Sequence, residues 1–162
     1  MSEQRELLST GAANVVVEIQ IEAPRTTTWQ AMIEDIGDWW RADFLVCENS
    51  QGMRMEPRLG GLLYEEVGGG AGFAWGRIIS FQPPRHLAYV AHVIPPWGGP
   101  AQSVVQLELA ETADGEATRL TLTDSIVGHL GEDLPDCLAA GWRQLYGDNG
   151  LKSFVEARAG SD

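Results

Sequence analysis

The sequence predicts an α+β fold in which a curved antiparallel sheet of about six to seven strands wraps round a long C-terminal helix, with two short helices after the first strand. Three observations lead to this class. Residues 53–124 consist of short apolar or alternating segments separated by glycine and proline turns, which is typical of an antiparallel meander. Residues 134–158 are the only long candidate helix. A sheet of this size needs a cover for one face, and that helix is the only element able to provide it.

The first strand and the two short helices come from residues 14–40. Residues 14–21 (NVVVEIQI) alternate between apolar and polar side chains, so a strand with one apolar face is expected. Residues 26–33 (TTTWQAMI) indicate a helix with a threonine as its N-cap and Trp29 in the core. Gly37 ends it, and Asp38-Trp39-Trp40 begins a second helical turn. The first strand would pair most economically beside the last, so that the sheet wraps round the long helix.

The remaining strands follow at intervals of roughly ten residues, with short turns between them. They are predicted at residues 53–56, 62–67, 73–82, 86–93, 103–111 and 117–124. Gly68-Gly69-Gly70 and Asp114-Gly115 are hairpin turns, and residues 95–100 (PPWGGP) form a rigid loop.

The first half of the long helix is amphipathic. Pro135 suits a first helical turn, and Asp136 lies where negative charge meets the positive end of the helix dipole. A helix over residues 134–158 would be roughly 36 Å long, enough to lie along the inner face of the sheet. Its apolar stripe is formed by Leu134, Leu138, Trp142 and Leu145.

The second half of this helix does not continue the stripe. On an uninterrupted helix the stripe would run into polar residues, namely Asn149, Lys152 and Glu156. The apolar residues would point nearly opposite, namely Leu151, Phe154 and Val155. Because residues 147–150 (GDNG) have poor helix propensity, a break, kink or bulge that turns the apolar face inward is expected there. The alternative is a straight helix whose second apolar face meets another subunit, and a homodimer rests on that face alone.

Length and charge bound the organisation and the partners. The 162 residues predict a single domain at residues 14–158, with a mobile lead-in at 1–13 and a tail at 159–162. A net charge of −12 argues against nucleic acid and anionic membrane surfaces as partners. Since no apolar run reaches membrane-spanning length and the N-terminus is polar, a cytoplasmic location is expected by default.

Metal and cofactor chemistry has no sequence signal. Cys47 and Cys137 lie far apart without metal-ligand spacing and are expected as reduced, buried thiols, although the start of the long helix could favour a Cys137 thiolate. No histidine–carboxylate metal spacing, phosphate-binding glycine loop or nucleophile elbow is present in the sequence. No metal and no cofactor are therefore predicted.

Candidate catalytic groups are few. His92 and Asp124 could form a base and its orienting partner if their strands were neighbours; otherwise they are a structural pair or unrelated surface groups. Glu65 and Glu66 are adjacent on a strand, so they face opposite sides and cannot act together on one substrate. No catalytic residue is assigned, and a binding protein is favoured over an enzyme.

Five segments in order carry a family resemblance. They are residues 17–29 (VEIQIEAPRTTTW), Asp38-Trp39-Trp40, Leu59-Gly60-Gly61, residues 76–87 (GRIISFQPPRHL) and Gly141-Trp142. Together they resemble the helix-grip fold of the START/SRPBCC superfamily, shared with the birch-pollen allergen. Within it, the chain looks most like the homologues of the activator of heat-shock protein 90 ATPase. The resemblance covers about residues 14 to 158.

The resemblance implies a cytoplasmic, stress-response protein with a hydrophobic cavity between sheet and last helix. Aromatic rings suit flat or hydrophobic ligands there, although they could equally fill the core. The predicted ligand-binding residues are Trp39, Trp40, Phe44, Tyr64, Trp75, Tyr89, Trp97, Leu107, Trp142 and Tyr146. The leading hypothesis is a non-enzymatic protein that binds a hydrophobic small molecule. The alternatives are a cyclase- or hydrolase-type enzyme using His92 or Asp124, and a chaperone-binding regulatory module.

Overall fold

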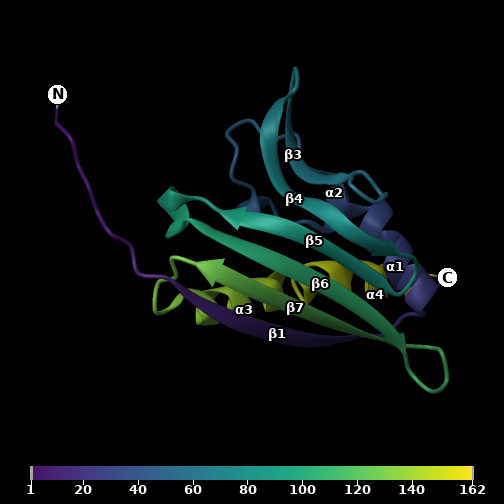
Figure 1. The fold of residues 1–162 in the computed structure, drawn as a ribbon. Helices are drawn as coiled ribbons and strands as arrows, with labels where there is room; N and C mark the ends of the chain where they lie inside the picture. The colour runs from purple at the N-terminus through teal and green to yellow at the C-terminus, as the bar shows by residue number, and fades with distance from the viewer. Residues whose placement is uncertain (1, 162) are drawn as a thin grey trace.

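A seven-stranded, curved antiparallel sheet forms one side of the protein, and the helices cover its concave face (Figure 1). The computed structural model describes residues 2–161. The strand order is β1-β7-β6-β5-β4-β3-β2. The strands are β1 (Gly11–Ile21), β2 (Met53–Met55), β3 (Leu62–Gly68), β4 (Ala71–Gln82), β5 (His86–Val93), β6 (Ala101–Glu111) and β7 (Thr118–Gly128). The predicted α+β class and the meander from β2 to β7 are confirmed.

The first strand pairs with the last, as predicted from the need to close the sheet round the helix. Val17 of β1 lies opposite Leu122 of β7, and both side chains are buried. β1 begins at Gly11, three residues before the expected start of the strand. Alternate residues of β1 point into the core because successive side chains of a strand face opposite sides of the sheet.

The two short helices follow β1, with a 3-10 turn after them. They are α1 (Arg25–Glu34), α2 (Ile36–Trp39) and the 3-10 turn η1 (Ala42–Phe44). Trp29 is buried in the core, as predicted. The expected threonine cap is wrong. Pro24 stands at the N-cap and no side chain caps α1, while Thr28, inside the helix, is buried with its hydroxyl 3.4 Å from that of Thr118.

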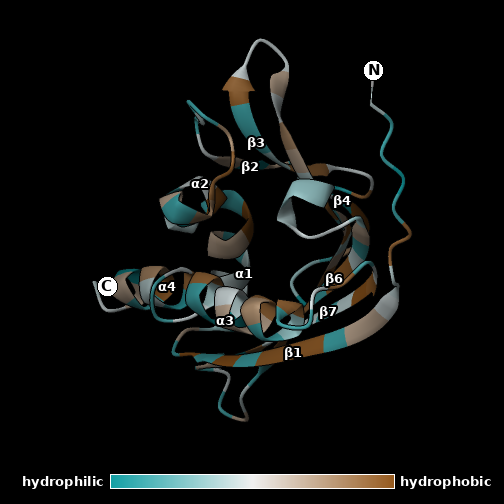
Figure 2. Cartoon of the chain, turned by 90° about the vertical axis from the view of Figure 1, so that its left-hand side faces the viewer, coloured by the Kyte–Doolittle hydropathy of each residue, from teal (hydrophilic) through white to brown (hydrophobic). Residues whose placement is uncertain are grey.

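The C-terminal helix is broken where its sequence predicts. α3 (Leu134–Tyr146) ends before Gly147, and α4 (Leu151–Ala159) begins after Gly150. Both helices lie along the inner side of the sheet, one after the other (Figure 2). Leu151 and Val155 are 0% and 1% exposed, so the break returns the second apolar face to the core. The straight-helix alternative is wrong. The apolar face from which a homodimer was inferred is therefore not available on the surface of α4.

The polar residues of α4 fasten it to the end of β1. The Lys152 ammonium donates to the carbonyl oxygen of Gln20 at 2.6 Å and pairs with Glu156 at 3.0 Å. Glu156 in turn accepts the backbone N–H of Glu22 at 2.9 Å. These bonds hold the polar side chains of Lys152 and Glu156 at the edge of the sheet. On an uninterrupted helix the same side chains would point into the core.

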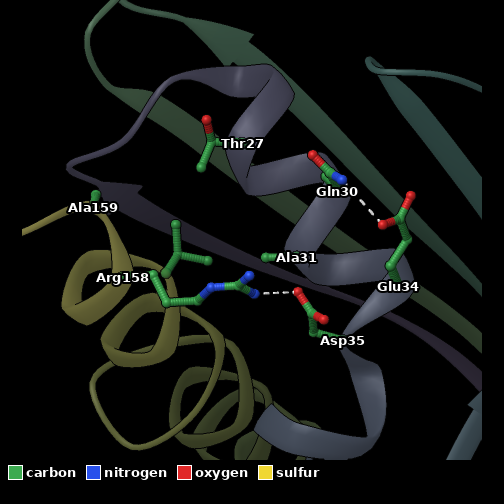
Figure 3. Close-up of a pocket in the computed structure, with 8 residues that line it drawn as sticks. Thr27, Gln30, Ala31, Glu34, Asp35, Arg158 and Ala159 are labelled. Carbon is green, nitrogen blue, oxygen red and sulfur yellow. Dashed lines mark hydrogen bonds and ion pairs between the residues drawn. The ribbon is translucent and has the colours of Figure 1, made fainter. Parts of the chain in front are cut away.

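A polar hollow of about 210 Å³ lies between α1 and α4 (Figure 3). Arg158 of α4 forms an ion pair with Asp35 across it, and Gln30 donates to Glu34 at 3.0 Å on its α1 side. Charged side chains line this hollow and link α1 to α4, so the hollow is poorly suited to an apolar ligand. Within residues 2–161, none of the helices combines the length and hydropathy needed to cross a bilayer.

Candidate ligand-binding site

A cavity of about 340 Å³ lies between α3 and the concave face of the sheet. Its lining is mostly apolar and comes from β4 to β7, the loops before β2 and after β5, and α3. The lining residues are Val46, Trp75, Tyr89, Ala91, His92, Val93, Trp97, Ser103, Val105, Asp124, Leu134, Leu138 and Trp142. A second hollow of about 180 Å³ shares Trp75, Leu138 and Trp142 with it and extends toward Trp40 and Phe44.

The sheet register places the lining side chains in one row. Tyr89 of β5 lies opposite Val105 of β6, which lies opposite Asp124 of β7. Residues in register across antiparallel strands point to the same face, so all three face α3. Gly76 of β4 makes room for this row, since a Cβ at that position would lie 2.4 Å from the ring of Tyr89. The glycine of the predicted family segment therefore shapes the cavity wall.

Aromatic rings form the wall near the solvent. Trp75 stacks on Trp97 with ring centroids 6.3 Å apart and an interplanar angle of 22°. The rings of Phe73 and Trp97 meet edge to face with centroids 5.0 Å apart, and those of Trp40 and Trp75 do so at 5.5 Å. Trp97 lies in the 3-10 turn η2 (Pro95–Trp97) and remains 38% exposed, so the cavity opens to solvent beside it.

The structure brings six of the ten predicted ligand-binding residues to the cavity or its extension. Trp75, Tyr89, Trp97 and Trp142 line the cavity itself. Trp40 and Phe44 line the second hollow, together with Trp75 and Trp142. Aromatic side chains therefore line the space between the sheet and α3, and most of them lie toward the start of α3.

The other four predicted ligand-binding residues line neither the cavity nor the second hollow. Trp39, Leu107 and Tyr146 are at most 4% exposed and fill the core; Trp39 packs on Tyr146 with ring centroids 5.2 Å apart. Tyr64 lies on the outer face of β3, because it alternates with the buried residues Leu63 and Glu65.

Asp124 is the one acidic side chain buried in this lining, at 1% exposed. The Trp142 indole N–H donates to its Oδ2 at 3.0 Å. Its Oδ1 has no hydrogen-bond partner within residues 2–161. Burial raises the pKa of Asp124, against the opposing effects of the Ser103 hydroxyl and the Trp142 indole. The cavity lining thus includes a buried carboxyl group, one oxygen of which has no hydrogen-bond partner in the part of the chain that the structure describes.

The condition for a pairing of His92 with Asp124 is not met. β6 lies between β5 and β7, so the two strands are not neighbours. His92 borders the cavity, but its side chain is exposed and alternates with the inward residues Ala91 and Val93. Of the two candidate catalytic groups, Asp124 is the one whose side chain faces the cavity.

Glu65 supports the cavity wall, a role that the sequence reasoning missed. Its carboxylate accepts the backbone N–H of Val46 at 3.0 Å, that of Cys47 at 2.8 Å and the indole N–H of Trp75 at 3.0 Å. Burial opposes ionisation of Glu65, but these donors outweigh it and hold its pKa below the usual range. The predicted opposition of Glu65 and Glu66 holds, since Glu65 is buried and Glu66 half-exposed. Glu65 points to the same face of β3 as buried Leu63, and the consecutive apolar residues 62–64 gave no sequence signal for that face.

The raised pKa of Asp124 predicts a specific pH dependence of stability. A carboxyl whose pKa is higher in the folded than in the unfolded protein favours folding when protonated. Its contribution therefore falls as pH rises from about 3.9, the unfolded value, through the raised folded value. We expect Asp124→Asn to gain stability relative to the wild type over that window, measured as the difference in urea midpoints at each pH. If the difference in urea midpoint between Asp124→Asn and the wild type stayed constant from acid to neutral pH, the raised pKa of Asp124 would be contradicted.

The cysteines differ from the predicted buried pair. Both are free, but Cys137 is exposed and Cys47 only half-buried. Residues 134–140 form the first turns of α3, whose outer side faces solvent, which explains the exposure of Cys137. In the part of the chain that the structure describes, no group of three or more His, Cys, Asp or Glu side chains is arranged to hold a metal ion.

Solved structures share this architecture. A protein from Rhizobium leguminosarum matches with a TM-score of 0.67 and 20% identity, over 94% of this chain and 99% of that one. SA2116 from Staphylococcus aureus matches with a TM-score of 0.64 and 12% identity, over 94% and 98% of the two chains. CalU16 from Micromonospora echinospora matches with a TM-score of 0.59 and 20% identity, over 94% and 84%. At these identities the likeness shows the fold alone, and it confirms the predicted helix-grip arrangement.

A family model gives the family directly. No match was found among the curated proteins. The model described as Activator of Hsp90 ATPase homolog 1-like protein matches residues 22–156, which span from the end of β1 into α4. This range includes every residue that lines the cavity. The chain therefore belongs to the family of Activator of Hsp90 ATPase homolog 1-like proteins.

Proposed function

We propose that this protein is a non-enzymatic binding protein for an apolar or aromatic small molecule, held between the sheet and α3. The observation that supports the proposal is the cavity of about 340 Å³, whose lining is mostly apolar and carries four aromatic side chains. Small-molecule sites usually have this character, with apolar walls and a few convergent polar groups. Here the polar groups are Asp124 and Ser103.

The size of the cavity favours a compact ligand. Ligand cavities commonly have volumes of about 300 to 1,000 Å³, so this one lies near the lower limit. A fused aromatic ring system can stack on Trp97 or Trp142, and such ring pairs contribute about 0.5–1.5 kcal/mol beyond the area they bury. A long lipid chain would also have to order many rotatable bonds on binding, which costs free energy. We therefore expect compact aromatic compounds to bind better than fatty acyl chains.

Thermal-shift measurements test the proposal. A ligand at a hundredfold excess over its dissociation constant stabilises the folded protein by about 2.7 kcal/mol. For a chain of this length that corresponds to a rise in Tm of roughly 5–11 °C. A screen of compact aromatic compounds should contain some that produce such a shift. If no apolar compound raises the Tm, the proposal is contradicted.

Trp97→Ala should weaken binding without unfolding the protein. Trp97 stacks on Trp75 at the open side of the cavity and is 38% exposed, so its removal takes away a ligand wall rather than core packing. We expect about tenfold weaker binding of an aromatic ligand and a small change in Tm. Leu59→Ala is the matched control, because Leu59 is 68% exposed and does not line the cavity. Equal affinities for the two variants would place the ligand elsewhere.

A further inference from the structure

We infer that the cavity selects hydrophobic amines, with the ligand ammonium against Oδ1 of Asp124 and its aromatic body against the tryptophan rings. The inference rests on the proposed function and adds the ligand class. Two independent observations support it. One is the buried carboxyl oxygen without a partner, and the other is the charge and aromatic character of the surrounding lining.

Oδ1 of Asp124 is a buried acceptor that lacks a hydrogen-bond donor within residues 2–161. The side chain is 1% exposed, so water does not solvate it as it would at the surface. The Trp142 indole donates to Oδ2. Among the described residues Oδ1 forms no hydrogen bond, although the Ser103 hydroxyl lies near enough to favour the carboxylate. A buried carboxylate is costly unless it is paired and hydrogen-bonded. A ligand ammonium would supply both the positive charge and the donor, whereas an alcohol would supply only the donor.

The rest of the lining favours a cation over an anion. Among the described residues that line the cavity, none is lysine or arginine. An anionic ligand would therefore find no counter-charge there and would lie near the carboxyl of Asp124. The faces of Trp75, Trp97 and Trp142 carry the negative side of the ring quadrupole and attract a cation within about 6 Å. The net charge of −12 also raises the local concentration of cations.

Ser103 is the second polar group beside Asp124. It is 4% exposed, lines the cavity and lies on β6, the strand next to β7. Its hydroxyl can both donate and accept a hydrogen bond, so it can complete the contacts of an ammonium that already meets Asp124. A hydroxyl carries no charge, however, and cannot replace the ammonium as the counter-ion of a carboxylate.

Calorimetric titration of three probes with one ring system tests the ligand class. The probes are naphthylmethylamine, naphthylmethanol and naphthoate, which present a cation, a neutral donor and an anion. We expect the amine to bind about tenfold or more tightly than the alcohol, since hydrogen bonds to charged groups are the stronger ones. Naphthoate should bind more weakly than the alcohol. Equal affinities for the amine and the alcohol would overturn the inference.

Asp124→Asn separates this inference from the proposed function. The amide can still accept the Trp142 N–H and would then turn its NH₂ group toward the ligand. We expect the variant to lose about tenfold or more of its affinity for the amine, and to keep its affinity for the alcohol within about threefold. If both probes bind to the wild type and the variant alike, the amine inference fails and the cavity proposal stands. If neither probe nor any other aromatic compound binds to the wild type, both fail.

A pH titration of the wild-type protein gives a second test that does not depend on how the variant folds. Tyr89 from β5 is the titratable group that interacts with Asp124, and Tyr146 from α3 lies next to Tyr89; burial raises the pKa of both tyrosines, so they stay neutral. Lowering the pH through the raised pKa of Asp124 protonates the carboxyl while the amine stays charged. Affinity for the amine should fall by about tenfold over this titration and affinity for the alcohol should not. Parallel profiles would contradict the inference.

Discussion

Replacing Gly150 by alanine should lower the free energy of unfolding by about 3 kcal/mol, a fall in Tm of roughly 6–12 °C for a chain of this length. A Cβ at Gly150 would lie 1.7 Å from the carbonyl oxygen of Leu145 and 2.6 Å from its carbonyl carbon. These are backbone atoms at the end of α3, so they cannot move aside as a flexible side chain would. Relief of the clash would shift α4 and withdraw Leu151 from the core. Urea or thermal unfolding followed by circular dichroism measures the effect.

The control for this variant is Gly131→Ala. Gly131 lies in the loop before α3, and a Cβ there would have no neighbour within 4 Å. Its substitution should change stability by less than about 0.5 kcal/mol. A Gly150→Ala protein as stable as this control would mean that the close approach of α4 to the end of α3 does not hold the helix break in place.

Glu65→Gln should cost about 2–3 kcal/mol and weaken ligand binding. The substitution replaces a charged acceptor that receives the N–H groups of Val46, Cys47 and Trp75. The amide offers only one acceptor oxygen and turns its own donors toward other donors, which leaves buried groups unsatisfied. Because Trp75 loses its anchor, the cavity wall should loosen as well. Denaturant midpoints and the affinity for an aromatic ligand measure the two effects.

The pH dependence of Glu65 has the opposite sign to that of Asp124. Since the folded pKa of Glu65 lies below its ordinary value, its stabilisation is fully present above about pH 4.3, the unfolded value. It is lost as the pH falls through the folded pKa, so the gap between wild type and Glu65→Gln should narrow in acid. Glu66→Gln is the matched control. Glu66 is half-exposed and pairs with Arg54 at 3.4 Å, so its loss should stay within about 0.5 kcal/mol at every pH. Equal losses for both variants would contradict the role given to Glu65.

The sequence predicted most accurately where a long pattern repeats or a local propensity is extreme. Alternation over residues 14–21 predicted β1 and its buried face, because one-sided burial leaves only one register. The Gly147 to Gly150 segment predicted the break between α3 and α4, because glycine, aspartate and asparagine are poor helix formers. The family resemblance implied a cavity lined by Trp75, Trp97 and Trp142, and the structure places these three side chains in the lining.

The site was predicted less well where neighbouring residues offer the same chemistry on both faces of a strand. In β3 the apolar residues Leu62, Leu63 and Tyr64 are consecutive, so the sequence does not say which of them faces inward. A shift of one residue exchanges the two faces, and the structure places Leu63 and Glu65 inside and Tyr64 outside. In β5 the same alternation of faces places His92 on the outer side of the sheet, away from Asp124.

The sequence by itself determined the α+β class, the order of the elements, the break in the last helix and the supply of aromatic rings. All of these follow from interactions between residues close together in the chain. Only the tertiary structure decided that the Trp142 indole reaches Oδ2 of Asp124 while Oδ1 has no hydrogen-bond partner among residues 2–161. It also decided that Glu65 binds both Trp75 and the loop before β2. Those contacts join segments far apart in the sequence. Whether a buried polar group has a hydrogen-bond partner depends on where the packed sheet and helix place the donors. The pattern of apolar and polar residues along the sequence does not predict that position.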